Sequence, residues 1–209
     1  MTPTTYEQRL DENPDWALRE GSMHFENESA VHKTLREIAR RLDELGVAYA
    51  VAGGMALYFQ GDLRFTEDVD ILVTREGIAR IHDELEGRRY LPPFTGSRNL
   101  RDTDTGVRIK FRFAGDYPGD GKPKPVAFPD PTGVAHEIDG IRFLDLQRLV
   151  ELKLASGMTH PRRKRDLVDV EELIDALKLS REFADELNPF VRDKYLELWQ
   201  TVKDYPDPE

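Results

Sequence analysis

The stretch VAGGMALYFQGDLRFTEDVDILV, residues 51–73, decides how this chain folds. Its first residues complete a short apolar strand over 47–52, and VDILVT (69–74) predicts a second strand. Two glycines and a short helix, MALYF (55–59), follow the first strand. Two aspartates open the second strand, although a buried strand has no structural need for charge there. Something must therefore neutralise the two carboxylates.

Asp68 and Asp70 are two residues apart in an expected strand, so their side chains project from the same face. Two carboxylates this close repel each other, and one takes up a proton unless a cation lies between them. Mg²⁺ (or Mn²⁺), held by carboxylates and substrate phosphates, would meet that need. The pair is therefore a candidate metal site. The alternative is a pair of solvated aspartates at a strand entrance, near a turn after Thr66.

Gly53 and Gly54 stand between the first strand and the helix that follows it. Glycines at such a place let backbone N–H groups approach a phosphate closely, and a helix N-terminus favours an anion. Taken alone, the two glycines are more typical of an ordinary tight turn. Combined with the aspartates of the neighbouring strand, they predict a site for a nucleoside triphosphate (NTP) and its metal ion.

The remaining pattern predicts an α+β (mixed α/β) fold, with flanking helices on a small mixed β-sheet. Helices are expected over 29–46, 75–87, 145–157 and 164–178, with a last pair broken near Asn188-Pro189; strands are expected over 106–113 and in a hairpin over 134–144. The Pro- and Gly-rich stretch 114–133 is expected to be a loop, either functional or disordered. We divide the chain into a loose lead-in (1–28, with a short helix near 6–10), a core (29–143) and a C-terminal helical region packed on that core (144–209).

Composition limits the function classes. Of the 209 residues, 39% are hydrophobic and 33% are charged, which is typical of a globular protein. No apolar run is long enough for a membrane span, and the N-terminus does not resemble a secretory signal. The absence of cysteine gives no indication of an oxidising compartment, so we predict a cytoplasmic protein. A formal net charge of -10 argues against general DNA binding.

The stretch from Gly53 to Val73 resembles the signature of the polymerase-β-type (minimal) nucleotidyltransferase superfamily. In that family Gly-Gly opens a helix and Asp-x-Asp begins the next strand. Arg64 and Thr66 also match the R-x-T-x-D-x-D form of its AbiEii-like branch. The resemblance covers roughly residues 30–178. It implies a nucleotidyltransferase fold and NTP as substrate, with Asp68 and Asp70 as metal ligands and catalytic residues.

A later segment, LVELKLASGMTHPRRKRDLVDVEELI (149–174), is similar to a Lys- and Asp-containing motif of the same branch. Lys153 falls on the apolar stripe of its helix, which fits either a side chain reaching to solvent or a cation aimed into a cleft. Asp166 stands at the start of the next helix, where an acidic residue is also favoured for its own sake. The resemblance assigns both residues to the catalytic site, with Lys153 on a phosphate and Asp166 orienting it or the substrate.

One departure from the family concerns the third carboxylate that these enzymes generally carry on a central strand. The matching strand presents Arg108, Lys110 and Arg112, and Lys110 occupies the expected position. Either another acidic residue replaces it (Asp102, Asp104 or Asp116), or one metal ion suffices, or transfer activity is lost. With Arg165 from the run RRKR, these bases form a candidate contact surface for phosphate or an acceptor.

Two functional hypotheses remain at this stage, beside a third possibility, a structural protein that binds no ligand. The first is a magnesium-dependent nucleotidyltransferase that transfers NMP to a tRNA or other RNA, a protein or a small molecule. The branch includes toxins of toxin–antitoxin pairs, so the resemblance implies an antitoxin protein as a partner. The second is a catalytically degenerate protein of the same fold that binds a nucleotide or a partner. The acceptor, the preferred nucleotide, the oligomeric state and the pathway do not follow from the sequence.

Overall fold

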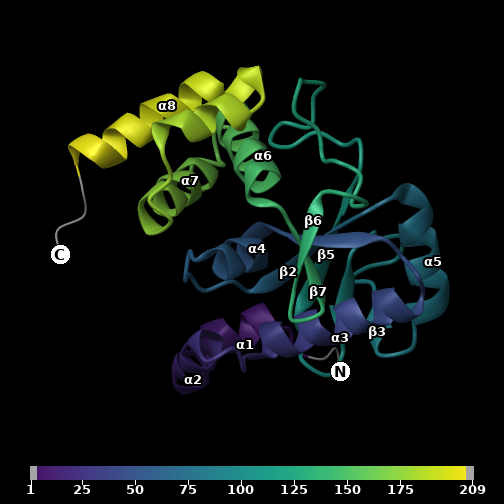
Figure 1. The fold of residues 1–209 in the computed structure, drawn as a ribbon. Coiled ribbons are helices and arrows are strands. Elements are labelled where there is room, and N and C mark those ends of the chain that lie inside the picture. Colours follow the sequence, from purple (N-terminus) through teal and green to yellow (C-terminus); the bar gives the residue numbers. More distant parts are fainter. Residues whose placement is uncertain (1–3, 206–209) are drawn as a thin grey trace.

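The computed structural model describes residues 4–205, in which helices surround one sheet (Figure 1). The helices are α1 (Tyr6–Glu12), α2 (Pro14–Phe25), α3 (Ala30–Glu44), α4 (Gly53–Gln60), α5 (Arg75–Leu85), α6 (Leu146–Thr159), α7 (Arg165–Ala176), the 3₁₀ helix η1 (Arg181–Glu186) and α8 (Pro189–Asp204). The strands are β1 (Tyr49–Ala52), β2 (Asp68–Val73), β3 (Tyr90–Leu91), β4 (Leu100–Asp102), β5 (Arg108–Phe113), β6 (Ala135–Ile138) and β7 (Ile141–Leu144).

The sheet has seven strands in the order β3-β4-β5-β2-β1-β7-β6. Strand β2 lies at its centre, antiparallel to β1 and parallel to β5, and β1 is parallel to β7. The two outer pairs, β3–β4 and β6–β7, are antiparallel. The predicted mixed sheet with flanking helices is therefore confirmed, and the two predicted aspartates open its central strand.

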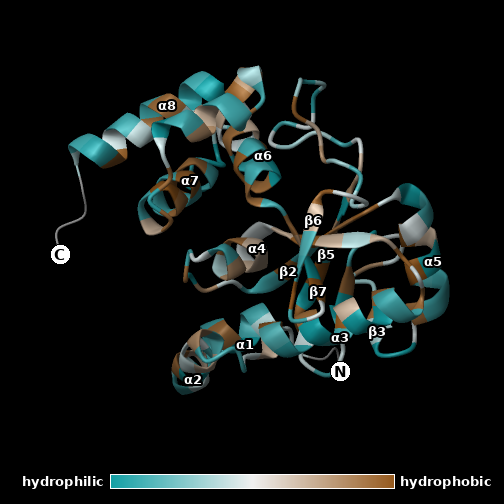
Figure 2. Ribbon diagram, in the orientation of Figure 1, coloured by the Kyte–Doolittle hydropathy of each residue, from teal (hydrophilic) through white to brown (hydrophobic). Residues whose placement is uncertain are grey.

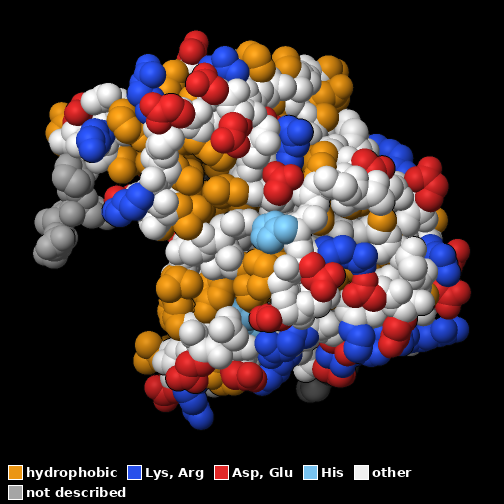
Figure 3. All heavy atoms as spheres, viewed as in Figure 1, with side chains coloured by type: hydrophobic (Ala, Val, Ile, Leu, Met, Phe, Trp, Pro, Cys, Tyr) orange, Lys and Arg blue, Asp and Glu red, His pale blue; other side chains and the backbone are white. Residues whose placement is uncertain are grey.

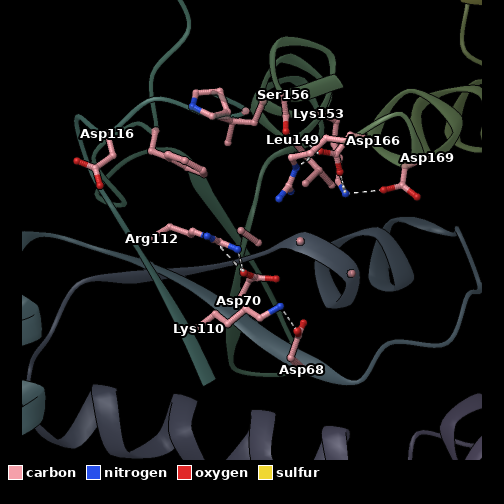
Figure 4. A pocket seen from close by; sticks show the side chains of 18 of the residues that line it. Asp68, Asp70, Lys110, Arg112, Asp116, Leu149, Lys153, Ser156, Asp166 and Asp169 are labelled. Carbon is pink, nitrogen blue, oxygen red and sulfur yellow. Dashed lines mark hydrogen bonds and ion pairs between the residues drawn. The ribbon is translucent and has the colours of Figure 1, made fainter. Parts of the chain in front are cut away.

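Alternation along β2 and β5 separates a core face from a polar face. Val69 and Ile71 of β2 are fully buried, as are Ile109 and Phe111 of β5. The positions between them are only half-buried, because side chains alternate between the two faces of a strand. The acidic and basic residues of these strands thus share one face, which the C-terminal helices approach (Figure 4).

The helices determine which segments pack against the sheet. Helix α3 packs against β2 and β7 through its buried apolar stripe, and Figure 2 shows hydrophilic residues over much of the outer sides of α3 and α5. Helices α6, α7 and α8 pack on one another, and α4 contacts both α6 and α7. Two segments distant in the sequence, the β1–β2 region and the α6–α7 pair, therefore meet at the polar face of the sheet.

The N-terminal segment is helical rather than a loose lead-in. Thr5 and Asn13 cap α1 and α2 with their side chains, and Tyr6 is fully buried. The Tyr6 hydroxyl donates to the carboxylate of Glu20, which also accepts from the backbone N–H of Ala30. The short helix expected near residues 6–10 is present as α1, whereas α2 was not predicted because the polar side chains of Glu20 and His24 occupy its buried positions. The proposed domain limits are a separate matter and stay a prediction.

The loop after β5 lacks helix and strand, as predicted, but it is held in place. The backbone N–H of Gly115 donates to the carbonyl of Phe128 (2.8 Å), and Asn188 donates to the carbonyl of Pro125. Gly119 packs so closely on α6 that an added Cβ would lie 2.2 Å from the Thr159 hydroxyl oxygen. These contacts hold the loop in a defined position beside α6. Short β3 and β4 were not predicted, because two or three residues carry no readable alternation.

Among residues 4–205, none of the helices combines the length and the hydropathy that crossing a bilayer requires. Figure 3 shows a hollow between the N-terminal elements and the C-terminal helices, with hydrophobic side chains gathered along it. At Gly61, just after α4, an added Cβ would lie 3.3 Å from Leu177 Cδ2, so the residues that follow α4 and α7 are in contact.

Candidate functional site

One cavity of about 830 Å³ brings together most of the predicted site residues. Its volume is in the range typical of small-molecule sites. The predicted residues that line it are Gly53, Gly54, Arg64, Thr66, Asp68, Asp70, Lys110, Arg112, Lys153, Arg165 and Asp166. Arg108 is outside this lining and lies between Glu7 and Asp68. Figure 4 shows the sheet residues on one side of the cavity and those of α6 and α7 on the other.

Basic side chains of β5 neutralise the two aspartates. Lys110 forms an ion pair with Asp68, and the guanidinium of Arg112 reaches Asp70 Oδ1 at 2.8 and 3.0 Å (Figure 4). Arg108 lies 3.5 Å from Asp68 Oδ2. The aspartates do share a face, as predicted. In this structure, however, the positive charge beside them comes from the neighbouring strand.

The two glycines are required by close approach as well as by backbone conformation. Gly53 has a φ of +62°, a left-handed conformation that favours glycine, and an added Cβ would lie 2.4 Å from Asp70 Oδ2. At Gly54 an added Cβ would lie 2.6 Å from the Thr66 hydroxyl oxygen. The start of α4 therefore lies directly against Asp70 and Thr66. This contact joins the two halves of the motif in space.

Lys153 does not reach out to solvent. Its side chain is 11% exposed, and its ammonium lies 2.9 Å from Asp166 Oδ1 and 2.5 Å from Asp169 Oδ2. Asp166 also accepts hydrogen bonds from the Ser156 hydroxyl (2.6 Å) and from Arg163 Nε (2.7 Å). Burial by itself raises the pKa of the Asp166 carboxyl, but Lys153 and these donors outweigh it and hold that pKa below its usual value.

Sequence reasoning missed Asp169, which is fully buried at the centre of this network. Besides Lys153, it binds Arg64 Nη2 (3.3 Å) and Arg165 Nε (3.2 Å). Asp169 follows Asp166 by three residues, so both lie on one face of α7, and that spacing was the signal available in the sequence. Asp169 links Arg64 of the β1–β2 region to α7.

Two of the three candidates for the third carboxylate lie outside the cavity. Asp102 is buried away from the cavity, where Arg89 binds it through two hydrogen bonds of 2.9 Å, and Asp104 pairs with the same arginine. Asp116 does line the cavity and forms ion pairs with Arg75 and Arg98. Asp102 and Asp104 are therefore outside the cavity, because Asp102 faces α3, where the Thr34 hydroxyl donates to it, on the other side of the sheet.

A second group of carboxylates lies close enough together to be considered as a metal site. Carboxylate oxygens of Asp62, Asp169 and Glu172 lie within 4.8 Å of one another, and burial and Glu172 raise the pKa of Asp62 to about 6. Arg165 binds both Asp169 and Glu172, and Arg64 lies 3.5 Å from Asp62. These guanidinium groups already supply the positive charge that a metal ion would bring. We therefore interpret this group as an ion-pair network.

A buried histidine pair supports the loop that carries Arg64. His24 Nε2 donates to the carbonyl oxygen of Arg64 at 3.1 Å, and the rings of His24 and His32 lie 4.7 Å apart. The Ser29 hydroxyl lies 2.9 Å from His32 Nδ1. Burial lowers the pKa of both rings, that of His32 to about 4. Both rings are therefore neutral in the folded protein at pH 7.

Acid should destabilise the protein through this pair. Between pH 6.5, which is the usual His pKa, and about pH 4, His32 binds a proton in the unfolded chain but not in the folded protein. The free energy of unfolding therefore decreases as the pH is lowered through this range. Because one pKa unit corresponds to about 1.4 kcal/mol, a pKa lowered from 6.5 to about 4 should cost about 3 kcal/mol of stability at acidic pH. Urea unfolding at stepped pH would measure it. A His32→Leu variant should lose this part of the pH dependence, and an unchanged dependence would contradict the assignment.

Comparisons with known proteins place the fold. No family model and no curated protein matches the sequence. The solution structure of the antibiotic-resistance factor ANT(2'')-Ia is similar, with a TM-score of 0.50 and 15% identity over 81% of this chain and 95% of that one. At this identity the similarity concerns the fold alone. The chain has a nucleotidyltransferase fold, the class that the sequence resemblance implied.

Two further solved structures are similar at lower scores. The crystal structure of ANT(2")-Ia in complex with adenylyl-2"-tobramycin has a TM-score of 0.48 and 13% identity, over 82% of this chain and 97% of that one. An antigenic nucleotidyltransferase-like protein from Paracoccidioides brasiliensis has a TM-score of 0.49 and 14% identity, over 84% of this chain and 88% of that one.

Proposed function

We propose that this protein is a divalent-metal-dependent nucleotidyltransferase, which transfers an NMP group from an NTP to an acceptor. The observation that carries the proposal is the meeting, in one cavity, of the glycine turn, the aspartate pair and the buried Lys153. A phosphate-binding turn, oxygen ligands for a metal and a cation near the phosphates are what an NTP–metal complex requires.

The residues present fit a divalent ion at the aspartate pair. Arg112 contacts Oδ1 of Asp70, and Oδ2 of the same carboxylate lies beside Gly53. The oxygen that would bind the metal ion is therefore adjacent to the turn that would bind the phosphates. Asp68 and Asp70 would hold Mg²⁺ or Mn²⁺. When bound, the ion would neutralise charge on the triphosphate.

The other residues would bind and orient the substrate. The backbone of Gly53 and Gly54 would receive phosphate oxygens, with Arg64 and Thr66 completing the nucleotide site. Lys153, oriented by Asp166, would stabilise charge on the phosphate during transfer. The acceptor oxygen would form a bond to the α-phosphorus as the bond to pyrophosphate breaks, and the acceptor proton would pass to solvent. Arg108, Lys110, Arg112 and Arg165 are the proposed further phosphate or acceptor contacts.

An Asp70→Asn substitution tests this function. Native protein, Mg²⁺ and each α-labelled NTP are incubated with total tRNA, with a protein extract or with a small-molecule pool. We expect label transfer to at least one acceptor, reduced about 100-fold or more in Asp70→Asn because a metal ligand is lost. Asp193→Asn, an exposed change on α8, is the matched control and should transfer normally. Transfer that survives Asp70→Asn would contradict the proposal.

The second candidate is a nucleotide-binding protein without transferase activity. One observation favours it, namely that Lys110 takes the place at which the family implies a third carboxylate and pairs with Asp68. This alternative predicts that metal–NTP complexes bind the native protein but that no acceptor becomes labelled. The same incubations therefore separate the two functions.

The finer assignment rests on the sequence motifs. We propose membership of the AbiEii-like branch, and with it a toxin role, from the R-x-T-x-D-x-D stretch and the later Lys and Asp motif. An RNA acceptor and an antitoxin partner belong to the same proposal. Growth arrest on expression, relieved by the product of a neighbouring gene and absent in Asp70→Asn, would support it. Unimpaired growth with active protein would overturn the toxin role alone.

A further inference from the structure

Strand β5 offers a row of positive charges to the carboxylates of β2. The two strands are parallel and in register, with Asp68 opposite Arg108 and Asp70 opposite Lys110. Each carboxylate is reached by the base two positions further along β5, since Lys110 binds Asp68 and Arg112 binds Asp70. This offset pairing gives each carboxylate a basic partner from β5.

The ion pairs of the two aspartates disfavour a bare metal ion at this place. The carboxylates joined in ion pairs across the sheet and α7 are those of Asp68, Asp70, Asp166 and Asp169, and the bases around them are Arg64, Lys110, Arg112, Lys153, Arg163 and Arg165. The cavity lining as a whole holds seven acidic and seven basic side chains, so its formal charge is balanced. A free dication at Asp68 or Asp70 must displace the base paired with that carboxylate, whereas an NTP–metal complex brings phosphates that can accept the displaced base.

Lys110 and Arg112 differ in how firmly they hold their partners. Arg112 binds Asp70 with two nitrogens of its planar guanidinium. Lys110 is a point charge on a flexible stem, its side chain is 26% exposed, and it lines the same cavity. A lysine so placed can leave one anion for another within reach of its stem. Arg112 is the fixed partner of the two.

We propose that Lys110 is an exchangeable counter-ion. Without nucleotide it neutralises Asp68, and when an NTP–metal complex enters, Asp68 passes to the metal and the Lys110 ammonium moves to the triphosphate. The inference rests on the proposed function and adds a binding order to it. Metal and nucleotide bind cooperatively, because each removes a cost that the other would meet alone.

Metal binding without nucleotide tests the first half of the exchange. Free Mn²⁺ is titrated against the native protein and Lys110→Met, with binding followed by electron paramagnetic resonance. We expect Mn²⁺ to bind about 10-fold more tightly to Lys110→Met, because the competing cation is gone. Lys110→Arg should stay close to native, and adding Asp68→Asn to Lys110→Met should abolish the gain. Lys203→Met, on the exposed side of α8, is the control.

Nucleotide binding tests the second half. Non-hydrolysable analogues of the four NTPs, each with Mn²⁺, should bind Lys110→Met about 10-fold more weakly than native protein, while Lys203→Met is unchanged. Native binding with Mn²⁺ and analogue affinities both within twofold in Lys110→Met would overturn the exchange alone. If the native protein binds none of the four analogues, the proposed function fails and the exchange fails with it. The native titration thus distinguishes the two failures.

Discussion

A Gly53→Ala substitution is expected to abolish nucleotide binding and to destabilise the protein by about 3 kcal/mol. The left-handed φ of +62° costs about 1 kcal/mol for any residue with a Cβ. The remainder comes from the new Cβ, which would lie 2.4 Å from Oδ2 and 2.9 Å from Cγ of Asp70. Either Asp70 or the start of α4 must shift, so the aspartate and the glycine turn no longer face one space.

Gly46→Ala is the matched control for this prediction. Gly46 also has a φ of +62°, but nothing lies within 4 Å of an added Cβ. It should therefore cost only the backbone penalty of about 1 kcal/mol and leave nucleotide binding intact. Urea unfolding and titration with a metal–NTP analogue measure the two effects. Equal losses in both variants would show that the contact with Asp70 has no role.

The core of the fold could be predicted because its signals are local. The alternation of β5, with Ile109 and Phe111 against Lys110 and Arg112, fixed both the strand and its two faces. The turn at Asp139-Gly140 likewise marked the β6–β7 hairpin, which the structure has. Patterns of this kind depend on neighbouring residues, and a single sequence displays them directly.

What the sequence concealed depends on register and packing between distant segments. The neutralisation of Asp68 by Lys110 follows from the pairing of β2 with β5, and no local pattern states that register. The sequence alone therefore did not reveal that basic side chains of β5 lie beside the two aspartates. Gly53 showed a similar limit, because its contact with Asp70 exists only in the folded chain. The positions of the motif came together as the resemblance implied, while their chemical roles stay predictions.

The burial of polar side chains is the second reason why sequence patterns did not reveal α2 and Asp169. Glu20 and His24 occupy inward positions of α2, so the helix has no apolar stripe to detect. Asp169 is likewise a fully buried polar residue, and three cationic side chains replace the water that would otherwise hydrate its carboxylate. A hydrophobic pattern treats such residues as exposed. Their hydrogen-bond partners, which come from other elements, decide otherwise.

A Lys153→Met substitution should destabilise the protein by about 4 kcal/mol and remove nucleotide binding. Lys153 is paired with two carboxylates that are 8% and 0% exposed, those of Asp166 and Asp169. Removing one partner of a buried ion pair leaves charge uncompensated, which costs far more than the pair itself contributes. The remaining partners, including Arg163 and Arg165, soften the loss without replacing the ammonium between the two carboxylates.

Lys194→Met separates this effect from the loss of any paired lysine. Lys194 pairs with the exposed Glu197 on α8, so its removal should cost less than about 1 kcal/mol. Adding Asp169→Asn to Lys153→Met should restore part of the stability, because one buried charge disappears with its partner. It should not restore nucleotide binding, since the cation facing the phosphates is still missing. Recovery of binding in the double variant would show that Lys153 serves the fold and not the ligand.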